Sequence, residues 1–133
     1  MKEEESTMIF QLRSTKTIPQ IDEALRESAA RHQFGVIAVH DLQQTMKNKG
    51  VDLATACLVY EVCNPHKAKA VLEADGALSA ALPCRISVYE AADGMHLATI
   101  LPTAMMKMFD SAALEPVARE VEDVVVAMMR DAS

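Results

Sequence analysis

The sequence has few aromatic residues, few cysteines and no long apolar run. Only 4% of its 133 residues are aromatic and tryptophan is absent, whereas nine are methionine, so the core must be aliphatic and rich in methionine. Such a core is adaptable because methionine side chains are flexible. A chain of this length buries roughly two thirds of its unfolded surface without disulfides or metals. We therefore expect one domain over residues 1–133, with its core at about 8–130 and residues 1–6 disordered.

Charge and hydropathy argue against two classes of partner. The formal net charge is −6, and lysine and arginine do not cluster as they do in proteins that bind phosphate backbones. The longest strongly apolar run, Val124–Met129, is far shorter than the roughly 20 residues that cross a bilayer. The first residues also lack the basic and apolar regions of a signal peptide. We therefore expect no nucleic-acid partner, no membrane association and a cytoplasmic location.

The cysteine count excludes a disulfide framework. Cys57, Cys63 and Cys84 are too few and odd in number, which agrees with a reducing compartment and leaves at least one thiol unpaired within the chain. Motifs of several enzyme classes are missing too, among them the nucleophile elbow, the glycine-rich phosphate loop and the dinucleotide fingerprint. The sequence leaves enzymatic activity open and favours a protein that is not an enzyme.

Hydrophobic periodicity and capping residues predict an α+β domain. The expected elements are a strand over 8–13, a helix starting at Thr17, a strand over 34–39, a short helix opening at Asp41, a strand over 56–63, a helix over 65–74, a hairpin of strands 84–90 and 95–101, and a long helix over 112–130. This order predicts a five-stranded, mostly antiparallel sheet. Because the strand over 56–63 is almost continuously apolar, we expect both of its faces to be covered.

Two short segments, 60–65 and 82–90, each place a cysteine where a strand meets a turn. Cys63 precedes Asn64, a favourable helix N-cap, and Pro65, a favourable first helical residue. The amide groups and dipole of that helix would stabilise a thiolate, so we expect a lowered pKa for Cys63. The alternative is a small buried residue that ends a strand, as free cysteines often are.

The second segment places Cys84 next to a charge. Neighbouring residues of a strand point to opposite faces, so Arg85 should point away from Cys84, which would share the core face with Ile86. If the strands of Cys63 and Cys84 are neighbours, the two thiols could form a reversible disulfide or ligate one ion together. Cys57 lies about 20 Å from Cys63 along the strand, so we expect it in the core instead.

Other polar residues offer weaker signals. Glu61 interrupts an apolar strand, so it needs either Arg85 as a partner or an edge position facing water. Cys63 and His66 have a Cys-x-x-His spacing, but a structural zinc site needs four ligands and no second pair of this kind follows. A haem ligand among the cysteines, His40, His66 or the methionines would be chemically competent, although the Cys-x-x-Cys-His attachment motif is absent.

These segments carry a resemblance to a known family. The matching segments, in chain order, are residues 34–37, 40–42, 59–65 followed by Ala68 and Leu72, 82–90, and Pro102. Together they resemble the domain of unknown function 302 family, most specifically in Cys63-Asn64-Pro65 and Leu82-Pro83-Cys84, over residues 8–109. The resemblance implies a curved antiparallel sheet held by a long helix, in the β-α-β4-α order of the TATA-box-binding-protein-like fold with short inserted helices. It implies little about function.

Three functional hypotheses follow. The first is a small module that binds a small-molecule ligand or handles thiol redox chemistry, with a site formed by Cys63, Cys84, Asn64, Pro65, Arg85 and Glu61. The second is a non-catalytic homodimer that pairs through a sheet edge or the long helix and presents a ligand groove, with structural cysteines. The third is a haem or metal binder that uses Cys63 or His66, although no cofactor is expected.

Overall fold

The structure is a computed structural model that describes residues 3–5, 8–109 and 112–133. Its six strands form one antiparallel sheet in the order β1-β2-β6-β5-β4-β3. The strands are β1 (Glu3–Glu5), β2 (Ile9–Ser14), β3 (Gly35–Asp41), β4 (Cys57–Cys63), β5 (Cys84–Ala91) and β6 (Gly94–Ile100). The helices are α1 (Ile18–Arg31), α2 (Leu42–Asn48), α3 (Pro65–Ala74), α4 (Pro102–Lys107) and α5 (Glu115–Ala132), with 3-10 helices η1 (Gly76–Ala80) and η2 (Ala112–Leu114).

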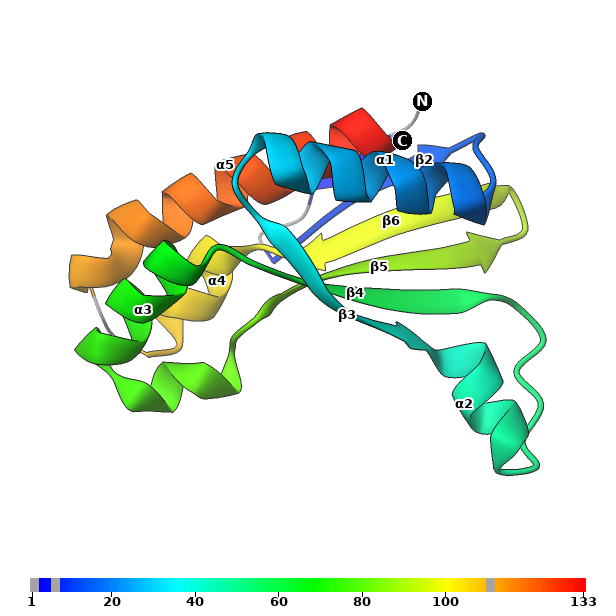
Figure 1. Cartoon of the computed structure of the whole chain (residues 1–133), viewed down its shortest axis with the longest axis horizontal. Helices are drawn as coiled ribbons and strands as arrows, with labels where there is room; N and C mark the ends of the chain where they lie inside the picture. The colour runs from blue at the N-terminus through cyan, green and yellow to red at the C-terminus, as the bar shows by residue number, and fades with distance from the viewer. Residues whose placement is uncertain (1–2, 6–7, 110–111) are drawn as a thin grey trace.

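The predicted α+β fold class is confirmed (Figure 1). All five expected strands are present, and their order with α1 and α5 is β-α-β4-α, with α2, α3 and α4 as insertions. The expectation of disorder over residues 1–6 is wrong for Glu3–Glu5, which pairs with β2 as the edge strand β1. The exposed edge of β2 offers backbone groups that this short segment satisfies. Residues 1, 2 and 6 lie outside the described part of the chain.

Capping side chains set the starts of helices α1 and α2. Thr17 and Gln20 form a reciprocal capping box at α1, with N···O distances of 2.9 and 3.4 Å. Asp41 accepts a 3.0 Å hydrogen bond from the Gln44 N–H at the start of α2.

The long helix starts later than expected. The sequence predicts a start at residue 112, but η2 occupies that position and α5 begins at Glu115.

Helices α1 and α5 lie together along one face of the sheet (Figure 1). The strand positions that point to this face are buried, as in the pairs Tyr60↔Ile86 and Val62↔Cys84. The positions between them, such as Val59 on β4, are only partly buried on the opposite face. The expectation that both faces of β4 are covered is therefore wrong, since an apolar strand tolerates one partly exposed face.

A second apolar cluster lies where α3, η1, α4, η2 and the start of α5 meet. Its buried residues are Val71, Leu78, Met106, Leu114 and Ala118. Leu82, on the segment that leads into β5, packs against this cluster and also against the main core. The site described below lies at this junction. Over the described residues, none of the helices has the length and apolarity needed to cross a membrane.

Candidate functional site

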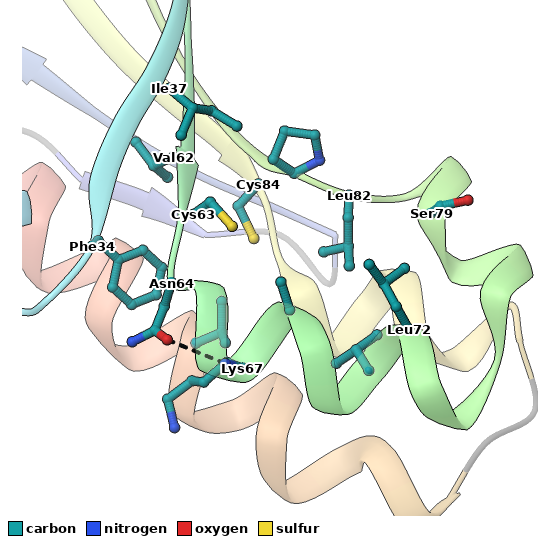
Figure 2. A pocket seen from close by; sticks show the side chains of 14 residues that line it. Phe34, Ile37, Val62, Cys63, Asn64, Lys67, Leu72, Ser79, Leu82 and Cys84 are labelled. Atoms are coloured by element: carbon teal, nitrogen blue, oxygen red, sulfur yellow. Dashed lines mark hydrogen bonds between the residues drawn. The ribbon is translucent and has the colours of Figure 1, made fainter.

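A cavity of about 260 Å³ lies at the junction of the two apolar clusters, beside the end of β4 and the start of β5 (Figure 2). Its fourteen lining residues are mostly apolar and come from distant parts of the chain. Phe34 comes from the turn before β3, Leu72 from α3, Leu82 from the segment before β5 and Val121 from α5. Three-dimensional folding, rather than any single motif, therefore builds this cavity.

Cys63 and Cys84 both line the cavity. Strands β4 and β5 are antiparallel neighbours with Val62 opposite Cys84, so Cys63 lies one residue farther, at the end of β4. The two sulfur atoms lie near each other in the view of Figure 2, and the charge of Cys63 contributes to the raised pKa of Cys84. Both residues, like Cys57, are free thiols. The two cysteine segments identified in the sequence thus meet at one place in the fold.

Burial controls the acidity of both thiols. It raises the pKa of Cys63, so the expectation of a lowered value is wrong. Burial and then the charge of Cys63 raise the pKa of Cys84 to about 11, and Arg85 offsets this only in part. The amide groups at the start of α3 are already used, because two of them donate to the Asn64 side chain at 3.0 and 3.1 Å. Both thiols are therefore protonated at neutral pH and are weak nucleophiles.

Polar groups of the lining lie mainly at the rim of the cavity. The ammonium group of Lys67 forms an ion pair with Glu120 of α5 and points away from the two sulfur atoms (Figure 2). The Asn64 side chain caps α3. The inner wall consequently consists of aliphatic and aromatic surface and two thiols, which a ligand would contact. Charged groups lie only at the edge.

Two predicted site residues lie on the other side of the sheet. Glu61 and Arg85 face each other across β4 and β5, with Oε1 of Glu61 3.7 Å from Nη2 of Arg85. Of the two alternatives for Glu61, the partnership with Arg85 is the one that the structure contains. His40 Nε2 adds a contact of 3.1 Å to the same carboxylate oxygen. Neither Glu61 nor Arg85 lines the cavity, because strand alternation turns them away from Val62 and Cys84.

The remaining candidates are also outside the cavity lining. Pro65 and His66, the first residues of α3, are exposed. Over the described residues, His, Cys, Asp and Glu side chains form no group of three or more that could hold a metal ion. Cys57 lies opposite Tyr89 at the far end of β4 and is partly exposed, so the expectation that it belongs to the core is wrong.

Sequence reasoning missed much of the cavity lining. Lys67, Ala68, Val71 and Leu72 recur at helical spacing on one face of α3, a signal that was present in the sequence. Phe34 and Val121 carry no local signal, because they reach the cavity only through the tertiary fold.

The comparisons with known proteins agree with this fold. The model of the family described as "Domain of unknown function DUF302" matches residues 10–132. The chain is also similar to a solved structure, that of an uncharacterized conserved DUF302 protein from Bacillus stearothermophilus. The two share 25% sequence identity with a TM-score of 0.91, over 96% of this chain and 100% of that one. No curated protein sequence matches. The resemblance seen in the sequence is thereby confirmed and extends through the long helix.

Proposed function

We propose that the chain, which belongs to the DUF302 family of domains of unknown function, is a binding module that takes up a small apolar ligand in its cavity. The observation that supports this proposal is the cavity of about 260 Å³ between the two apolar clusters. An unfilled apolar cavity forfeits packing contacts, so an apolar ligand that fills it gains them. Pockets for drug-sized ligands span roughly 300–1,000 Å³, so this ligand belongs to a smaller class.

The state of the thiols favours ligand binding over redox catalysis. Reactive cysteines have lowered pKa values and good access to solvent, whereas burial raises the pKa of both Cys63 and Cys84. A binding role requires no thiolate. The homodimer and the cytoplasmic location expected from the sequence stay predictions.

Filling the cavity from α3 tests the proposal. Ala68 lines the cavity, whereas Ala70 on the same helix is exposed, so Ala68→Leu and Ala70→Leu are matched variants with the same change in helix propensity. Ligand-observed NMR with small aromatic and aliphatic fragments measures binding, and circular dichroism confirms that each variant is folded.

We expect fragments that bind the unmodified chain to bind the Ala70→Leu variant equally. The Ala68→Leu variant should bind them about tenfold more weakly or not at all, a loss of about 1.4 kcal/mol or more. Equal binding by the two variants, or no fragment binding to the unmodified chain, would contradict the proposal.

A further inference from the structure

The two thiols at the cavity wall form an isolated pair of soft ligands. Cys63 and Cys84 come from adjacent strands and line the same cavity, and their sulfur atoms lie near each other in the view of Figure 2. Cys84 is buried, with 6% of its surface exposed, whereas Cys63 is partly exposed. The surrounding wall is apolar, so the pair lies in a water-poor environment.

We propose that Cys63 and Cys84 form a two-thiolate binding site for a soft monovalent cation of the Cu(I) class. Soft thiolate ligands select Cu(I), and this ion is stable with two thiolates in a near-linear arrangement. A structural zinc site needs four ligands, and the described residues contain no group of three or more His, Cys, Asp or Glu that could hold a metal. Hard ions such as Ca²⁺ need several oxygen ligands, which this apolar wall does not supply.

The binding step balances without a change in oxidation state. Each thiol releases one proton, two sulfur–copper bonds form, and the bound unit carries a single negative charge. The two protons go to solvent, and no oxidant or reductant takes part. The site therefore requires only thiols that Cu(I) can deprotonate, and it does not require an activated nucleophile.

The third cysteine of the chain supplies a matched control. Cys57 lies at the opposite end of β4 from Cys63 and does not line the cavity. If single thiols bound Cu(I) independently, substituting any of the three cysteines would lower Cu(I) binding to the same extent. If the pair forms the site, only substitution of Cys63 or Cys84 lowers it.

The experiment is an anaerobic titration of the chain with Cu(I) in competition with the chelator bathocuproine disulfonate. We expect one tightly bound Cu(I) per chain, retained by Cys57→Ser and weakened by about a hundredfold or more in Cys63→Ser and in Cys84→Ala, which is about 2.7 kcal/mol. Circular dichroism and size-exclusion chromatography verify that the variants are folded. Cys63 is partly exposed, so the Cys63→Ser variant keeps the test valid if Cys84→Ala fails to fold.

Three results would overturn the inference. These are Cu(I) retention in Cys63→Ser, an equal loss in Cys57→Ser, and one Cu(I) shared between two chains through a single cysteine of each. The inference concerns the same cavity but does not rest on uptake of an apolar ligand. Fragment binding is measured without metal and depends on Ala68, so failure of one proposal is distinguishable from failure of the other.

Discussion

Neighbouring residues on β4 and β5 show how different the two faces of the sheet are. Glu61 and Arg85 face each other on the partly exposed side, where His40 contacts the same carboxylate. One step along the strands, Val62 and Cys84 face each other on the side covered by α1 and α5 and form part of the cavity wall. The charged pair and the thiol are adjacent in sequence but lie on opposite sides of the sheet.

The two faces also differ in what they contribute physically. Burial of apolar surface stabilises the covered face by roughly 25 cal/mol per Å², whereas exposed ion pairs contribute about 0–1 kcal/mol each. The comparison teaches that charge beside a cysteine in the sequence does not determine its acidity. The burial of its own face does, as the raised pKa of Cys84 beside Arg85 shows.

The largest expected effect is a difference between the two faces in how much a substitution lowers the free energy of unfolding. Ile86 on the covered face has no exposed surface, so Ile86→Ala leaves a cavity in the main core and should lower the free energy of unfolding by about 3–4 kcal/mol. Arg85→Ala, the neighbouring change on the other face, should cost about 1 kcal/mol or less, since 54% of that side chain is exposed. Urea unfolding measures both values. Equal losses for the two variants would contradict the assignment of the faces.

Thiol reactivity sharpens the comparison through chemistry. The pKa of Cys84 is raised to about 11 from the ordinary value of 9.0, so its thiolate fraction near pH 8 is lowered about a hundredfold. Iodoacetamide labelling, followed at each cysteine by mass spectrometry, should therefore modify Cys84 last and the partly exposed Cys57 first. The rate at Cys84 should still rise about tenfold per pH unit at pH 9, below its pKa. Labelling of Cys84 as fast as Cys57 would show that the cavity wall does not shield its thiol.

A polar link tests whether the covered face depends on burial alone. The Tyr60 hydroxyl donates a 2.7 Å hydrogen bond to Asp22, which ties β4 to α1. Tyr60→Phe should lower the free energy of unfolding by about 1–2 kcal/mol at pH 7, because the bond involves a charged acceptor. A variant as stable as the unmodified chain would show that apolar packing alone holds α1 on the sheet.

The same link has a defined pH dependence. Burial alone would raise the pKa of Asp22, but hydrogen bonds from Arg26 and Tyr60 lower it below its unfolded value. The stabilisation is therefore complete above the unfolded pKa of Asp22 and is lost as the pH falls through its folded pKa. Urea unfolding across the acid range should show the difference between Tyr60→Phe and the unmodified chain shrinking as the pH falls. A difference that stays constant would exclude the Asp22 carboxylate as the acceptor that matters.

Local signals in the sequence predicted much of this fold. The hairpin of β5 and β6, the caps at Thr17, Asp41 and Asn64, and strand alternation depend on residues a few positions apart, and the structure follows them. Alternation also predicted correctly that Cys84 lies on a buried face. Family resemblance added the order of the elements but no function.

The acidity of Cys63 and the position of Cys57 could not be read from the sequence. The Asn64 cap occupies amide groups that would otherwise stabilise a Cys63 thiolate. The burial that raises the pKa of Cys63 depends on the tertiary fold. The apolar pattern of β4 likewise does not show which face the helices cover, so the sequence predicts a core position for Cys57 that the structure does not have. The cavity depends on Phe34 and Val121, which only the folded chain brings together.

The smallest expected effect tests whether the two faces are electrostatically independent. Glu61→Gln removes the charge that Arg85 and His40 share, and should cost about 0.5–1 kcal/mol at low salt. Because the Debye length falls from about 10 Å at 0.1 M to about 3 Å at 1 M salt, this cost should shrink in urea unfolding at high salt. The labelling rate of Cys84 should change by less than about twofold, since the side chains of residues 61 and 84 point to opposite faces. A larger change would mean that the charge on the exposed face reaches the thiol through the sheet, and burial alone would no longer account for its raised pKa.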